Sequence, residues 1–160
     1  MFDITLITVG KLKEKFYLTA AEEYCKRLKG YCNVQIIELP EHRLPENPSS
    51  AEINAGLEKE AELIFARIPK GAWFCTFTPE GKILSSEGFA DKLKEVKLSG
   101  KSSACFLIGS SFGMAPRVKE RADFKLSMGP MTFPHHLARI MVLEQIYRAE
   151  SIQAGSKYHK

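Results

Sequence analysis

The sequence of 160 residues has no apolar run close to the roughly 20 residues that a membrane-spanning helix requires. Its first residues, MFDITLITVGKLKEKF, lack a basic segment ahead of the apolar stretch, so they are not typical of a secretory signal peptide. We therefore expect a cytoplasmic protein that has no membrane partner.

Cysteines are few, and their spacing is not that of a ligand set. None of the four cysteines forms a CxxC pair or lies near a histidine at metal-ligand spacing. Cys75 and Cys105 stand inside the apolar runs WFCTF and ACFLIG, where buried free thiols are common. We predict neither a disulfide framework nor a metal site.

The signatures of nucleotide-triphosphate sites are also absent. The loop GSSFGM (109–114) precedes a predicted helix, but it lacks the lysine and the spacing of a P-loop, and its glycines do not fit GxGxxG. A net charge of +4 is too small to demonstrate nucleic-acid binding. The basic stretches KLKEKF and CKRLKG could still create a positive face, although a solvated helix surface explains them equally well.

What the sequence does contain is a regular alternation of strand and helix patterns. Strands are predicted at 2–10, 33–40, 72–78, 104–109 and 124–128, and helices at 12–29, 51–67, 87–96, 116–121 and 136–149, with Ser50 as a candidate cap of the second helix. This order predicts an α/β fold with a mainly parallel sheet flanked by helices. Because no repeat or linker interrupts the pattern, we predict a single domain spanning residues 1–160.

Three glycine-containing loops follow predicted strands, at 78–82, 109–114 and 128–133. Ligands of open α/β sheets bind beyond the carboxyl ends of strands, so these loops are the candidate site. Met128, Met131 and Phe133 offer polarizable apolar surface for a flat aromatic group, and backbone groups freed at Gly129–Pro130 could bond a purine edge. The alternative is a hydrophobic plug over the end of the sheet.

The last predicted helix, HLARIMVLEQIYRA, is apolar on nearly every side. A helix that is apolar on all sides is usually buried on all sides, and in a small domain one face would stay exposed unless a second subunit covered it. We therefore predict a homodimer. Glu144 interrupts the apolar surface and is expected to pair with Arg148, four residues further on. His135, at the start of this helix, is a candidate for acid–base chemistry, whereas His159 lies in a terminus of the kind that usually frays.

Three motifs, in order, resemble the RlmH family: FLIG with its glycine-bearing loop, LSMGPMTFPHHLARIMVLEQIYRA, and the terminal YHK. ITVGKLKEKF at the start matches that family too, so the resemblance covers nearly the whole chain. Members of that family are SPOUT-class methyltransferases, which use S-adenosylmethionine to methylate N3 of a pseudouridine in 23S ribosomal RNA. The resemblance implies a homodimer and a deep trefoil knot in roughly residues 72–160, an exception to the rule that chains do not knot. Recognition of the RNA within the assembled ribosome is expected, because a small domain reads loops and shape better than duplex sequence.

The resemblance also implies site residues. Cofactor contacts would fall on Phe77, Gly109, Met128, Gly129, Pro130, Met131, Thr132 and Phe133. Tyr158 and His159 would lie near the target base, with His159 favoured as the general base over His135. Lys160 would contact an RNA phosphate, and Arg139 would hold RNA or brace the dimer. Lys157, where this chain departs from the family, would add charge beside the RNA.

The sequence departs from the family pattern at three positions. The family commonly has a second glycine where Ser110 stands, often proline where Lys157 stands, and a branched aliphatic residue where Phe77 stands. We expect cofactor binding to tolerate the serine. Two alternatives to methylation of 23S ribosomal RNA stay open, namely a SPOUT methyltransferase with another target such as tRNA, and a non-enzymatic RNA-binding dimer with a decayed cofactor site.

Overall fold

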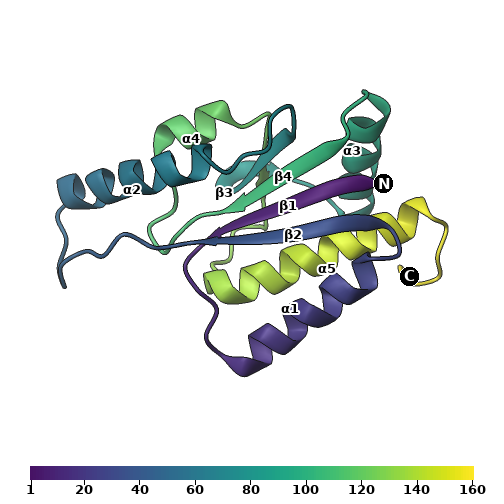
Figure 1. Ribbon diagram of the computed structural model, residues 1–160, viewed down its shortest axis with the longest axis horizontal. Coiled ribbons are helices and arrows are strands. Elements are labelled where there is room, and N and C mark those ends of the chain that lie inside the picture. Colours follow the sequence, from purple (N-terminus) through teal and green to yellow (C-terminus); the bar gives the residue numbers. More distant parts are fainter.

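The computed structural model describes residues 1–160 and contains one five-stranded sheet with the strand order β2-β1-β4-β3-β5 (Figure 1). The strands are β1 (Phe2–Val9), β2 (Cys32–Leu39), β3 (Trp73–Ile83), β4 (Ser103–Ile108) and β5 (Phe124–Ser127). Every neighbouring pair is parallel, so the predicted α/β fold is confirmed.

Helices cover both faces of this sheet. They are α1 (Lys15–Leu28), α2 (Ser50–Phe65), α3 (Ser86–Leu98), α4 (Pro116–Arg121) and α5 (His135–Gln153). Helices α1, α3 and α5 pack on one face, and α2 and α4 pack on the other (Figure 1). Strand β1 serves both layers, because Ile4 and Leu6 enter the first core while Ile7 and Val9 enter the second.

None of the helices is long and apolar enough to cross a membrane. Cys75 and Cys105 are fully buried free thiols, as predicted from their apolar runs. Burial raises the pKa of both thiols, so they are protonated and unreactive.

The ends of several elements differ from their predicted bounds. Ser49, not Ser50, caps α2, because its side chain accepts from the Glu52 N–H while the Glu52 carboxylate accepts from the Ser49 N–H. The predicted turn at 78–82 is an irregularity within β3, where Leu126 of β5 pairs with Phe77 and, after a shift of register, with Lys82.

The chain comes unusually close to itself at this irregularity. A Cβ atom on Gly81 would lie 2.6 Å from the carbonyl carbon of Leu126, so only glycine lets the two backbones approach this closely. This contact joins the irregular segment 78–82 of β3 to β5 at the carboxyl edge of the sheet. The knot implied for residues 72–160 stays a prediction.

Candidate active site

The three predicted loops meet in one cavity at the carboxyl ends of β3, β4 and β5. This strand-end cavity has a volume of about 460 Å³, which is typical of small-molecule sites. All eight positions assigned to cofactor binding line it: Phe77, Gly109, Met128, Gly129, Pro130, Met131, Thr132 and Phe133. Residues from three separate loops are therefore brought to one site.

The loop after β4 is closed by two backbone hydrogen bonds. Ser110 N–H donates to the Gly113 carbonyl at 3.0 Å, and Gly113 N–H donates to the Ser110 carbonyl at 2.8 Å. The turn is so tight that a Cβ on Gly109 would overlap the Gly113 carbonyl oxygen. The Ser110 hydroxyl lies 3.4 Å from the same carbonyl, so the serine at this position fits against its own turn.

The loop after β5 leaves backbone and hydroxyl groups beside the cavity. Gly129 has a φ of +108°, and its N–H donates to the Ser127 hydroxyl at 3.1 Å. Thr78, which lines the cavity from the irregular segment of β3, has a buried hydroxyl oxygen with no protein partner. A small ligand with polar edges and a flat apolar body, such as an adenosine, would fit these groups.

His135 also lines the strand-end cavity, at the first turn of α5. Burial lowers its pKa, and the positive potential of His136 and Arg139 adds to that effect, while Glu41 and Glu14 oppose it. The imidazole is therefore neutral at pH 7. A neutral ring beside the cavity can accept a proton.

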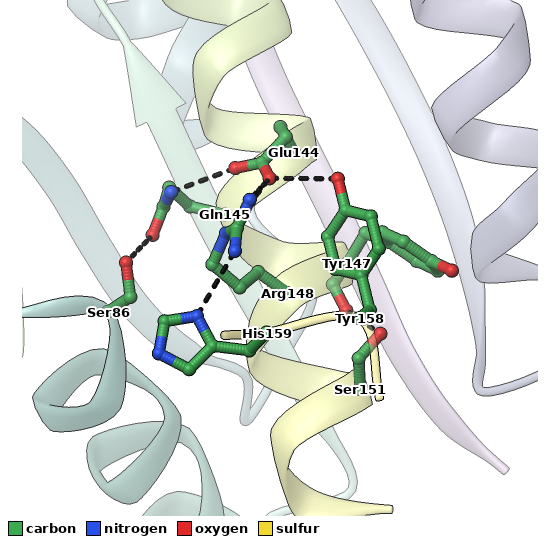
Figure 2. A network of polar contacts seen from close by, with 8 residues as sticks. All are labelled: Ser86, Glu144, Gln145, Tyr147, Arg148, Ser151, Tyr158 and His159. Atoms are coloured by element: carbon green, nitrogen blue, oxygen red, sulfur yellow. Dashed lines mark hydrogen bonds and ion pairs between the residues drawn. The ribbon is translucent and has the colours of Figure 1, made fainter. Parts of the chain in front are cut away.

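Tyr158 and His159 do not line the strand-end cavity. Within the chain, the tail folds back against α3 and α5 (Figure 2). His159 Nδ1 lies 3.1 Å from an Arg148 nitrogen, and its Nε2 lies 2.7 Å from the Glu87 carboxylate. The terminus that was expected to fray is thus held by charged partners.

Glu144 organises the polar contacts around the tail (Figure 2). Its carboxylate accepts from the Tyr158 hydroxyl at 3.1 Å and from Arg148 Nε at 2.9 Å, so the predicted Glu144–Arg148 pair is confirmed. Burial and the bond to Glu144 raise the pKa of Tyr158 to about 12. The phenol is accordingly a hydrogen-bond donor at neutral pH and not a base.

The three positions assigned to RNA differ in their exposure. Lys157 and Lys160 are exposed at the tail. Arg139 is only 3% exposed, and its guanidinium donates to Glu38 at 2.7 Å and to the Gly10 carbonyl at 3.1 Å. The expected contact of Arg139 with RNA therefore finds no support in this conformation, in which Arg139 fastens the loop after β1.

A second cavity lies between the helices. This helix cavity of about 480 Å³ is lined mostly by apolar side chains of α1, α3 and α5 and by the end of β5. Ser86, Glu144 and Gln145, which belong to the polar network of the tail, also line it (Figure 2). It shares Phe77 and Met128 with the strand-end cavity, so the two cavities lie on either side of these residues.

Two functional features were missed from the sequence. Glu38 is the only charged residue of the strand segment NVQIIELP, and its isolation there was the one available sign of an internal partner. The sequence also does not predict the polar groove beyond β1 and β2, because the walls of this groove come from loops that are far apart in the chain. The two basic stretches lie at opposite ends of α1.

Comparison with known proteins decides the family. A family model described as a predicted SPOUT methyltransferase matches residues 2–159. The chain belongs to the SPOUT methyltransferase family. It is 47% identical over 158 residues to ribosomal RNA large subunit methyltransferase H of Alkaliphilus oremlandii (strain OhILAs), covering 99% of each chain. The protein of the same name from Clostridium botulinum (strain Okra / Type B1) is 44% identical with the same coverage.

These relatives confirm the RlmH resemblance that the motifs indicated. The fold agrees as well. A solved structure described as a probable methylase family protein from Haemophilus influenzae Rd KW20 superposes with a TM-score of 0.52 at 13% identity, covering 99% of this chain and 70% of the other. Membership of a methyltransferase family makes the chain an enzyme that requires a methyl donor.

Proposed function

We propose that this enzyme transfers a methyl group from S-adenosylmethionine to N3 of a pseudouridine in 23S ribosomal RNA, acting on the assembled ribosome. The observation that carries the proposal is the strand-end cavity, where three loops and His135 meet. The names of the relatives support ribosomal RNA of the large subunit as the substrate. We further propose that residues 1–160 act as one SPOUT domain with the knot in roughly 72–160.

The cavity supplies what such a methyl donor needs. Met128, Met131 and Phe133 would pack against the adenine, while backbone groups around Gly109 and Gly129 would bond its polar edges. S-adenosylmethionine, when bound, supplies a methyl group on a sulfonium. The residues around it then have two tasks, to hold the attacking nitrogen in line and to remove its proton.

The proton on N3 must leave before or during attack, and a histidine is the natural acceptor. The resemblance favours His159, but in the described chain His135 alone of the two lines the strand-end cavity. We assign proton removal to His135, because its neutral ring lines the cavity of its own chain whichever subunit supplies the tail. Tyr158 and His159 are assigned to positioning the target base, and Lys157 and Lys160 to its phosphates.

The position of the tail supports a dimeric enzyme. The tail lies beside the helix cavity, whose apolar lining a second copy would cover. Since the tail does not line the strand-end cavity of its own chain, we propose that it serves the strand-end cavity of the partner. The dimer would then be a condition of activity and not only of stability.

Two measurements test the function. Calorimetry with S-adenosylhomocysteine should give a heat of binding, and labelled S-adenosylmethionine should methylate purified ribosomes but not bulk tRNA. Labelling of tRNA instead would favour the alternative RNA target. An absence of both binding and labelling would identify a dimer with a decayed site and overturn the proposal.

A further inference from the structure

A third cavity lies directly beside the strand-end cavity. This basic groove has a volume of about 750 Å³ and runs between the loop after β1 and the loop 40–48 after β2. Phe112 and His135 line both the groove and the strand-end cavity. A chain lying in the groove would therefore lead to the site of methyl transfer.

The groove carries the charges that an RNA backbone needs. Lys11 and Lys13 line one wall and Arg43 lines the other, and all three side chains are exposed. Glu41 and Glu46 line the groove too, so two carboxylates face these three cations. The fixed charge of the lining is positive, which favours phosphate over a neutral ligand.

The backbone that carries the two lysines is held by hydrogen bonds to two side chains. Leu12, between them, is 3% exposed, and its N–H donates to Glu38 at 2.9 Å. The same carboxylate oxygen accepts from Arg139, which also donates to the Gly10 carbonyl. This clamp joins the lysine loop to α5, whose His135 lines the same groove, and holds the backbone of both lysines in place before any ligand arrives.

The opposite wall is fastened in a similar way. The His42 N–H donates at 2.8 Å to Glu60, a carboxylate of α2 that is only 5% exposed. Arg43 is the next residue, so its guanidinium also extends from an anchored point. Neither wall needs to fold when a ligand binds, which lowers the entropy cost of binding.

Phe112 adds an aromatic surface where the two cavities meet. It lies at the tip of the loop after β4, and its side chain is 48% exposed. An exposed aromatic ring beside lysines is the arrangement that proteins use to stack an unpaired base while they hold the adjoining phosphates.

We propose that the basic groove binds the single-stranded RNA next to the target nucleotide, with Lys11, Lys13 and Arg43 on phosphates and Phe112 stacked on a flanking base. This inference rests on the proposed function, since it names a subsite for the same RNA. It assigns to these four residues recognition of RNA and no part in holding the methyl donor.

The test compares the double variant Lys11→Ala/Lys13→Ala with the control Lys59→Ala/Lys94→Ala, whose exposed lysines lie on α2 and α3 and make no ion pair. Binding to purified ribosomes is measured at several salt concentrations, and binding of S-adenosylhomocysteine is measured by calorimetry. We expect the groove variant to bind ribosomes about tenfold or more weakly, with a shallower salt dependence, and to keep its nucleoside affinity. The control should stay within about twofold of the parent protein.

The stacking role is tested with Phe112→Ala and Phe112→Tyr. The alanine should raise KM for ribosomes by about fivefold or more, and the tyrosine should restore it, because one stacked base is worth roughly 1–3 kcal/mol. Equal ribosome binding by the groove and control pairs, or an alanine variant with the KM of the parent protein, would overturn the inference. The binding measurement needs no turnover, so loss of methylation in the parent protein would count against the proposed function alone.

Discussion

His135 stands at the meeting point of the strand-end cavity and the basic groove. Its neighbours are arranged so that the ring is uncharged when the enzyme works, because burial and His136 lower its pKa. A lysine or a tyrosine at this position would not serve as a base, since each is protonated at pH 7 unless its pKa is lowered greatly. A single side chain thus links the donor site to the RNA site.

Replacement of His135 by glutamine should lower kcat by about 10²–10⁴-fold while affinity for S-adenosylhomocysteine changes little. In the parent enzyme, kcat should rise with pH and level off below the ordinary histidine value of about 6.5, because the lowered pKa keeps the ring neutral above that point. Rate measurements from pH 5 to 8 test this expectation. The variant His159→Gln should show the same rise of kcat with pH as the parent enzyme. The assignment to His135 fails if His159→Gln loses this rise and His135→Gln retains it.

Glu60 offers a second prediction at the scale of one residue. Burial raises the pKa of its carboxyl although the His42 N–H favours the charged form. The folded protein then holds a proton more tightly than the unfolded chain, so stability falls as pH rises above the ordinary glutamate value. Urea unfolding at pH 5 and pH 8 should show this loss in the parent protein and a smaller loss in Glu60→Gln.

The matched variant Glu60→Ala separates the effect of the Glu60 charge on stability from the effect of its hydrogen bond to the His42 N–H. It removes the acceptor of the His42 N–H, and we expect a loss of about 1–3 kcal/mol at both pH values. If Glu60→Gln unfolds with the full pH dependence of the parent protein, the carboxyl of Glu60 is not its source.

At the scale of an element, the loop after β4 depends on the absence of a side chain at Gly109. A Cβ there would overlap the Gly113 carbonyl oxygen and open the two-bond turn that forms one wall of the cavity. Gly109→Ala should therefore weaken binding of S-adenosylhomocysteine by about tenfold or more and lower stability by about 1–3 kcal/mol. Calorimetry and thermal unfolding measure the two effects.

Gly30→Ala is the control for this change. Gly30 lies at the end of α1, and the nearest atom to an added Cβ is the Arg27 carbonyl oxygen at 3.9 Å. The control should bind the ligand and unfold like the parent protein. A Gly109→Ala variant that binds with the parent affinity would contradict the tight-turn explanation.

The whole molecule decides whether the tail can reach a target base. Deletion of Tyr158–Lys160 removes the contacts to Glu144, Arg148 and Glu87 but no residue that lines the strand-end cavity. We expect the deletion to abolish methylation, to leave affinity for S-adenosylhomocysteine within about threefold, and to leave a dimer of twice 18.0 kDa in light scattering. Unimpaired turnover would refute a role for the tail.

Mixing the two inactive proteins tests the proposed exchange of tails. The deletion variant keeps an intact cavity and the nearly inactive His135→Gln variant keeps an intact tail, so a mixture of the two should recover about a quarter of the parent sites. Subunits must first be allowed to exchange, for example by mild urea and dialysis. If the mixture stays inactive although mixed dimers are present, the tail serves its own chain.

Much of the fold could be predicted because its signals are local. Neighbouring residues predict the strand in the apolar run FDITLITV and the ligand loop in MGPMTF (128–133). The misplaced cap of α2 shows the limit of such signals, since Ser49 and Ser50 are chemically identical and only the bond to Glu52 selects one. The sequence predicts Gly81 only as part of a turn. Its close approach to Leu126 could not be predicted, because it joins segments that are distant in the chain.

By itself, the sequence determined the alternation of elements, the three loops and the family, because periodicity, glycine, proline and motif spacing act over short stretches of chain. Only the tertiary structure decided the order of the strands, the enclosure of Arg139 and the place of the tail. Arg139 meets its partner Glu38 across 101 residues, and His159 meets Glu87 across 72. A contact of that kind leaves no local pattern, since either side chain would look the same on a solvated surface until the fold brings the two together.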